Sequence, residues 1–492
     1  MIWILIRKEI QETIVDSRFW IASVLCTLLV PLGMYVSLKN YEQRLESYQT
    51  STQQYVRHSR GRIDANFEAK GYRPPSPLSV FARGLKDLLN LKVTTTRTGN
   101  VEIVSEPDST NLQAALFGKI DFVYIITTVL SLLAFIFTFS SVTGEREMGT
   151  LRLMLSNATP RSSIILAKII GSFLVFLAPF ALSILIGLLV LSTSSVFSFG
   201  SSGILPAVLM MLFITLLFMF CIFCLGVLVS TLTHRSLVSM IVVLLVWVVW
   251  ALVVPKVSPM IAQIAYPIQS PQVVEDQKQM ARENLLNELT VKKSDLFKSK
   301  MADVQKMMTD GKGQANFSNM QQSAMEAKKA YDQEKVPLER EYEQRIDEAV
   351  RLVENAYANK RQIQTAIAVN LSRLSPICCL TYALSELAGT GTLELESFRR
   401  KAGQFQDQVK QTVYDNFETM EIATGGRGGM NVAYAKEGID PNSISVPQLS
   451  GYKHTALGEA LQTTWVDIML LALFAILFFF GAFVKFLKYD VR

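Results

Sequence analysis

The chain has 492 residues, of which 50% are hydrophobic and only 18% are charged, a balance that favours a membrane protein over a soluble one. The formal net charge of +6 is spread along the chain, whereas nucleic-acid binding calls for a concentrated basic face with aromatic residues. We therefore expect no nucleic-acid partner. A modest excess of Lys and Arg is instead typical of the cytoplasmic ends of membrane spans.

The first residues predict an amphipathic helix over 1–18 that lies on the cytoplasmic leaflet and leads into the first span. Apolar residues such as Ile2, Leu5 and Ile6 recur at helical spacing, and Arg7 and Lys8 lie opposite. Acidic residues follow closely and the first apolar run ends without a small-x-small cleavage site, which argues against a cleaved signal peptide. We expect this first span to anchor the chain.

Six segments are apolar and long enough to cross a bilayer, for which a helix needs roughly 20 residues. The predicted spans are 19–38, 122–142, 164–191, 204–229, 237–254 and 465–486. Pro179 lies inside the third span, where we expect a kink or a break. The sequence therefore predicts an all-α polytopic membrane protein.

The Lys and Arg residues that flank the spans predict the orientation of the chain. Basic residues precede the first span, lie between the second and third and between the fourth and fifth, and follow the last, within the tail 487–492. All four clusters fall on one side of the membrane if both termini are cytoplasmic. The two long segments 39–121 and 255–464 are then extracytoplasmic insertions.

The two insertions differ in their patterns. The first combines a polar, helix-compatible stretch, a Pro-rich extended segment and a β-like stretch, with Gly99-Asn100 as a turn. The second has two amphipathic helical stripes around a turn at 309–317, which predict an antiparallel helical hairpin that is either functional or a simple spacer. We expect 370–391 to lie on the outer membrane surface or to pack on the bundle.

Residues for catalysis or metal binding are scarce. The chain has three well-separated histidines and no phosphate-binding loop, zinc-protease motif or serine nucleophile elbow. The five cysteines form no disulfide framework. No Asp or Glu lies in the middle of a span, which argues against an ion-coupled carrier. We expect no catalytic residue, metal site or cofactor in this chain, so energy for any transport has to enter from outside the bilayer.

The segment 143–163 interrupts the apolar spans with several charged residues. Five of them, from Glu145 to Arg161, would cost on the order of 10–15 kcal/mol inside the hydrocarbon core, so the segment lies outside it. An ordinary polar loop is one interpretation. The other is a short, stiff element that a cytosolic partner grips through its apolar side, to which Leu151, Leu153, Met154 and Leu155 contribute.

The order of residues in this segment favours the second interpretation. The run GEREMGTLRLMLSNATPRSSIILAK, residues 144–168, resembles the signature of ABC-2 type exporter permeases. With its enlarged loops the chain is similar to the branch of gliding-motility and copper-site-maturation permeases. The resemblance implies a six-span half-transporter whose cytoplasmic coupling helix docks a separate ATPase. The residues assigned to this coupling are Glu145, Arg146, Glu147, Gly149, Thr150, Leu151 and Arg152.

These observations predict the permease subunit of an ATP-driven ABC exporter in a bacterial inner membrane. The expected partners are an ABC ATPase dimer, which holds ATP and Mg²⁺, a second permease copy or paralogue, and membrane lipids. In the alternative, the complex transmits force to a periplasmic partner through the helical hairpin, and no substrate passes through the bundle.

Overall fold

The computed structural model describes residues 2–59, 68–84, 91–95, 102–105, 121–156, 160–194, 197, 203–309, 317–422, 430–436, 444, 447–449, 452, 454 and 456–488. These residues form two compact units. Unit 1 consists of Met1–Lys256 and Ser372–Arg492, and unit 2 consists of Val257–Leu371.

The fold class predicted from the sequence is confirmed, because the described residues are mainly helical and six helical stretches have the length and hydropathy of membrane spans. These stretches are Ser17–Ser59, Phe122–Glu147, Arg161–Ser192, Ile204–Leu232, Ser236–Ala265 and Leu457–Leu487. They are built from α2 (Ser17–Ser59), α5 (Phe122–Tyr124), η2 (Ile125–Leu130), α6 (Ser131–Thr138), α7 (Thr143–Glu147), α9 (Arg161–Ser192), α10 (Ile204–Leu232), α11 (Ser236–Val248), η3 (Val249–Val253), α12 (Val254–Ala265) and α17 (Leu457–Leu487). Helix α9 runs without a break through Pro179.

The other elements of the described residues are shorter helices, five strands and the two long helices of a hairpin. They are α1 (Ile2–Val15), β1 (Ala69–Tyr72), η1 (Pro77–Val80), β2 (Leu91–Thr95), β3 (Glu102–Ser105), α8 (Thr150–Ser156), α13 (Pro271–Thr309), α14 (Phe317–Ser372), α15 (Pro376–Leu387), α16 (Thr392–Asn416), β4 (Phe417–Ile422) and β5 (Met430–Ala435).

Helix α10 lies at the centre of the apolar bundle of unit 1. It contacts α6, α9, α11, α15 and α17, and its side chains are among the most buried in the chain. Small residues allow this close packing: a Cβ atom added to Gly226 would overlap the side chain of Thr138 on α6. Tight helix contacts of this kind position the loops at the end of the bundle.

A smaller core in unit 1 joins the two predicted insertions. Strands β1, β2 and β3 form an antiparallel sheet, in which Gly71 is paired with Val93. Phe398 and Phe405 of α16 are buried in a cluster with Val93 and other apolar residues of this region. The predicted turn at Gly99-Asn100 lies outside the described residues.

Helix α15 is packed on the bundle, which is one of the two placements expected for residues 370–391. Its side chains contribute to the main apolar core, and it contacts α10 and α17. Just before it, Arg373 forms a bidentate ion pair with Asp467 of α17, with Nε–Oδ1 and Nη2–Oδ2 distances of 2.7 and 3.0 Å. The pair compensates a carboxylate that is almost fully buried.

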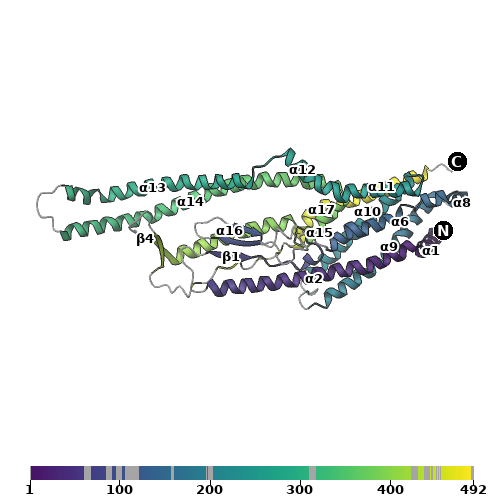
Figure 1. The fold of residues 1–492 in the computed structure, drawn as a ribbon, viewed down its shortest axis with the longest axis horizontal. Coiled ribbons are helices and arrows are strands. Elements are labelled where there is room, and N and C mark those ends of the chain that lie inside the picture. The colour runs from purple at the N-terminus through teal and green to yellow at the C-terminus, as the bar shows by residue number, and fades with distance from the viewer. Residues whose placement is uncertain are drawn as a thin grey trace. The chain divides into compact units, whose positions relative to one another are not determined.

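Unit 2 is built mainly on an antiparallel pair of long helices, α13 and α14, which lie side by side (Figure 1). The apolar stripes expected from the sequence face inward here, since Leu289 and Tyr342 are buried. Charged side chains flank this seam in the ion pairs Lys278–Glu354, Lys293–Glu339 and Lys300–Glu334. Most of the predicted turn at 309–317 lies outside the described residues.

Candidate functional site

The segment between α6 and α9 contains two short helices, α7 and α8, separated by Gly149. This glycine has a φ of +76°, a left-handed conformation that costs a residue with a Cβ roughly 1–2 kcal/mol. No atom lies within 4 Å of a Cβ added there, so the conformation, rather than a lack of space, favours glycine. The turn at Gly149 lets the chain change direction between α7 and α8.

Helix α10 holds the start of α7. The backbone N–H groups of Val142 and Thr143 donate hydrogen bonds to the Ser230 hydroxyl, over 3.0 and 3.2 Å. Arg146 Nη1 also donates to the Thr233 carbonyl over 3.0 Å. These bonds satisfy backbone groups that a helix end leaves unpaired, and they fix α7 against the end of α10.

Glu147 connects the segment to α11. Its carboxylate accepts hydrogen bonds from the backbone N–H and the hydroxyl of Ser236, the first residue of that helix, over 2.9 and 2.7 Å. A carboxylate at a helix N-terminus is stabilised by the unpaired N–H groups and by the helix dipole. Glu147 therefore caps a helix that lies 89 residues further along the chain.

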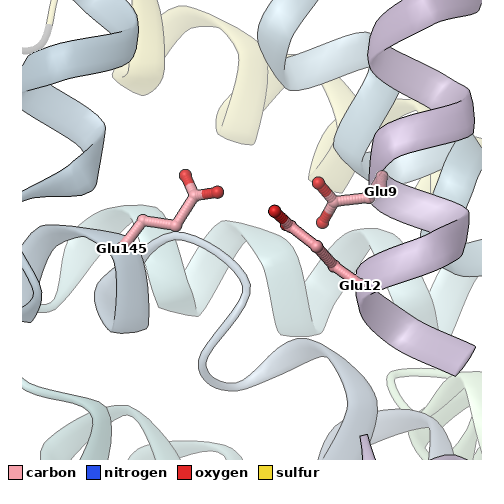
Figure 2. Close-up of side chains that lie close together, drawn as sticks. All are labelled: Glu9, Glu12 and Glu145. Atoms are coloured by element: carbon pink, nitrogen blue, oxygen red, sulfur yellow. The ribbon is translucent and has the colours of Figure 1, made fainter. Parts of the chain in front are cut away.

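Glu145 connects the segment to α9 and, through it, to α1. Its Oε1 atom lies 2.8 Å from Nζ of Lys168, which is 2% exposed. The same Nζ lies 3.4 Å from Oε2 of Glu9. Burial raises the pKa of Glu9, and the positive charge of Lys168 opposes that shift. The carboxylates of Glu9, Glu12 and Glu145 lie close together here (Figure 2). We call these three residues, with Lys168 and Lys8, the Lys168 cluster.

A close contact between α1 and α9 makes this cluster geometrically possible. A Cβ added to Gly171 would lie 2.9 Å from Cβ of Glu9 and 3.4 Å from the Ile6 carbonyl oxygen. Glycine therefore lets α1 approach α9 closely enough for Glu9 to reach Lys168.

The apolar residues of α8 divide into inward and outward groups. Leu151 is fully buried in a cluster with residues of α9, α10 and α17, among them Ile164 and Phe486. Met148 and Leu153 are 72% and 73% exposed, and Arg152 is also exposed. From the sequence, the apolar residues of α8 are all expected to face a partner. In the structure Leu151 packs in the protein's own core, whereas Leu153 lies on the surface.

The structure therefore places the seven predicted site residues in one segment with two kinds of environment. Glu145, Arg146, Glu147 and Leu151 contact the spans, whereas Gly149, Thr150 and Arg152 are exposed. Sequence reasoning missed Thr233 as the partner of Arg146 and Ser236 as the partner of Glu147. Ser236 does stand directly before an apolar run, where a helix begins, but nothing local to it points to Glu147.

The comparison with known families agrees with this arrangement. A family model described as ABC-2 family transporter protein matches residues 3–491. The chain belongs to this family. It is therefore a multi-pass membrane protein and a transmembrane subunit of an ABC transporter, and the resemblance seen in residues 144–168 is confirmed. A search of curated proteins finds no match to the chain.

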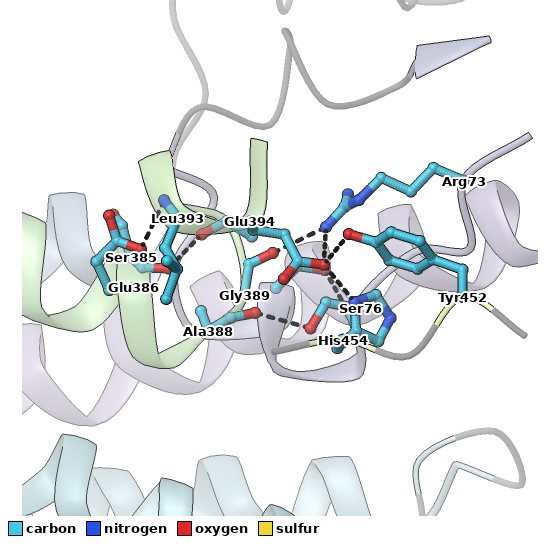
Figure 3. Close-up of polar contacts among 12 residues, drawn as sticks. Arg73, Ser76, Ser385, Glu386, Ala388, Gly389, Leu393, Glu394, Tyr452 and His454 are labelled. Atoms are coloured by element: carbon cyan, nitrogen blue, oxygen red, sulfur yellow. Dashed lines mark hydrogen bonds and ion pairs between the residues drawn. The ribbon is translucent and has the colours of Figure 1, made fainter. Parts of the chain in front are cut away.

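This permease has a second polar cluster, centred on Glu394 of α16 (Figure 3). Oε1 of Glu394 accepts hydrogen bonds from Nη2 of Arg73 and the hydroxyl of Tyr452, over 2.9 and 2.7 Å, and lies 2.8 Å from Nδ1 of His454. Burial alone would raise the pKa of Glu394. The hydrogen bonds with His454 and Tyr452 and the charge of Arg73 outweigh it and lower the pKa to about 2.

The Glu394 cluster clamps three segments that are distant in sequence. Arg73 follows β1, Glu394 lies in the first turn of α16, and Tyr452 and His454 precede α17. Close by, the Ser76 hydroxyl donates to the Ala388 carbonyl over 2.7 Å. All three contacts converge on one oxygen of the Glu394 carboxylate, which ties the three segments together at a single point.

Proposed function

We propose that this permease couples ATP hydrolysis by a separate ATPase dimer to export across a bacterial inner membrane. In this proposal α7 and α8 lie in the cytosol, both termini are cytoplasmic, and ATP and Mg²⁺ bind to the ATPase rather than to this chain. A second permease copy or paralogue completes the pathway. The family supports association with an ABC ATPase subunit, and the geometry of α7 and α8 supports the place of docking.

The observation that carries the proposal is that one short segment is bonded to three different spans. Glu145 forms an ion pair with Lys168 of α9, and Arg146 donates a hydrogen bond to a carbonyl at the end of α10. Glu147 caps the first residue of α11. A displacement of the segment is therefore transmitted to all three helices, because charge-assisted hydrogen bonds resist separation more strongly than neutral ones. A polar loop with no mechanical role has no need of three such connections.

The outward face of the segment offers a docking surface for the ATPase. Met148 and Leu153 are exposed apolar side chains, and Arg152 lies beside them in sequence. Met and Arg are enriched in protein–protein interfaces relative to the rest of the surface, and exposed apolar side chains supply area that a partner can bury. The buried Leu151 holds this face in place from behind.

The test is Leu153→Glu in the purified permease, with its ATPase subunit added. A charge placed in the centre of an interface should weaken binding by roughly 2 kcal/mol, or about 30-fold. Binding would be measured by co-purification and by titration of the ATPase. The fold should be unaffected, since exposed substitutions usually change stability by no more than about 0.5 kcal/mol.

Leu352→Glu is the matched control, because Leu352 is 70% exposed but belongs to α14 of unit 2. It should leave ATPase binding unchanged. Equal binding by wild-type and Leu153→Glu permease would contradict the docking surface.

The alternative function, force transmission to a periplasmic partner, is favoured by one feature of unit 2. Helices α13 and α14 contain 39 and 56 residues and are joined by ion pairs, as a stiff lever would be. Deleting residues 274–366 separates the two functions. Export through the bundle should survive the deletion in a vesicle transport assay, whereas force transmission should be lost.

A further inference from the structure

The Lys168 cluster brings together three carboxylates from two helices. One carboxylate oxygen of each of Glu9, Glu12 and Glu145 lies within 4.8 Å of the others. Glu145 is only 9% exposed, and its Oε2 atom is buried without a hydrogen-bond partner among the described residues. Figure 2 shows the Glu145 carboxylate directed towards Glu9 and Glu12. Buried polar groups normally have a partner, and an ion bound beside this oxygen would supply one.

The charges of the cluster do not balance. Lys168 is shared by Glu9 and Glu145, and Lys8 is paired with Glu12 over 3.2 Å. Three carboxylates thus face two ammonium groups, and one negative charge is left over beside a buried region. A divalent cation that displaces Lys8 from Glu12 would bring the charge of the cluster, with Lys168 retained, to zero.

We propose that the Lys168 cluster binds a hard divalent cation of the Mg²⁺ type between α1 and α7. The donors are all carboxylate oxygens, the ligands that Mg²⁺ and Ca²⁺ prefer over softer donors. Lys168 occupies Oε1 of Glu145, which leaves the unpaired Oε2 for the ion. Mg²⁺ usually keeps several of its waters, which also separate it from the Lys168 ammonium group.

The three ligands differ in accessibility in a way that suits binding from solution. Glu12 is exposed and Glu9 is half-buried, whereas Glu145 is 9% exposed. The ion enters past Glu12 and exchanges the Lys8–Glu12 pair for a metal–carboxylate contact. Once bound, it connects α1 directly to α7, in addition to the connection through Lys168. The site does not depend on the proposed ATPase coupling and can be tested on the permease alone.

The experiment titrates MgCl₂ into the full-length permease in nanodiscs of zwitterionic lipid, by isothermal titration calorimetry. CaCl₂ forms a second arm, and Mn²⁺ followed by electron paramagnetic resonance gives an independent signal. We expect one saturable site per chain in the wild-type protein. Glu12→Gln should weaken it by at least about tenfold, since even the loss of a residue behind a ligand costs about 10–100-fold.

Asp16→Asn is the matched control, because Asp16 follows α1, carries the same charge and is exposed. The backbone N–H of Arg18 donates a hydrogen bond to Oδ1 of Asp16. The side-chain oxygen of Asn can accept the same bond, because Asn caps a helix about as well as Asp. This variant should bind Mg²⁺ like the wild type. The melting temperature of Glu12→Gln without Mg²⁺ verifies that the variant is folded.

Two results would overturn the proposal. One is the absence of saturable binding by the wild-type protein up to about 10 mM of either cation, above the range of weak biological sites. The other is an equal loss of affinity in Glu12→Gln and Asp16→Asn, which would show that the ions respond to general surface charge.

Discussion

The two polar clusters of unit 1 differ in the ratio of carboxylates to the groups that surround them. In the Glu394 cluster one carboxylate is surrounded by Arg73, Tyr452 and His454, and its pKa falls to about 2. In the Lys168 cluster three carboxylates share two ammonium groups, and one oxygen of Glu145 has no hydrogen-bond partner among the described residues. In the first cluster a single carboxylate is held by three donors, whereas the second has more carboxylates than ammonium groups and can still take up positive charge.

This difference corresponds to the segments that each cluster joins. The Glu394 cluster connects loops and α16 within the small core of unit 1, where a fixed arrangement is sufficient. The Lys168 cluster connects α1, α7 and α9, the helices around the proposed docking segment.

Of the substitutions that test this comparison, Lys168→Met should lower the free energy of unfolding most. This change leaves Glu9 and Glu145 close together with no buried cation, and breaking a buried ion pair on one side costs roughly 3–5 kcal/mol. The free energy of unfolding would be measured by denaturation in mixed micelles. ATPase coupling should be lost in the same variant.

A triple variant, Lys168→Met with Glu9→Gln and Glu145→Gln, distinguishes charge imbalance from loss of packing. Removing all the charges should restore most of the stability, since neutral replacements of a buried ionic group are often tolerated. Continued instability of the triple variant would show that the geometry of Lys168, rather than its charge, supports this end of the bundle.

The sequence predicts the local features of this molecule better than its long-range bonds. Hydropathy reveals all six spans, because an apolar run of sufficient length is a local property. The charged segment after α6 is equally visible. The partner of Glu147 is not, since Ser236 lies 89 residues away and no pattern near either residue connects them.

The sequence also leaves the faces of α8 undetermined. Leu151 and Leu153 look equivalent as apolar residues, but the structure buries the first and exposes the second. A helix of seven residues has about two turns, too few for periodicity to show which side faces the bundle. The orphan oxygen of Glu145 depends on side chains from three helices, so only the structure reveals it.

A substitution in the Glu394 cluster should lower the free energy of unfolding less than Lys168→Met, and its effect should depend on pH. A pKa lowered from 4.5 to about 2 means that the folded state favours the ionised carboxylate. The cluster therefore stabilises the fold above pH 4.5 by about 3 kcal/mol. That contribution is lost progressively as the pH falls from 4.5 towards 2. Glu394→Gln should remove it at every pH.

The measurement compares the unfolding free energies of wild type and Glu394→Gln between pH 7 and pH 3. The difference between them should be largest at neutral pH and should shrink below pH 4.5, because only the wild type has a carboxylate to protonate there. Glu459→Gln is the control, since Glu459 is exposed at the start of α17 and has the same charge. A difference that stays constant with pH would show that Glu394 acts through packing instead of through its charge. The contrast between a single carboxylate held by its donors and a cluster with excess carboxylates would then no longer hold.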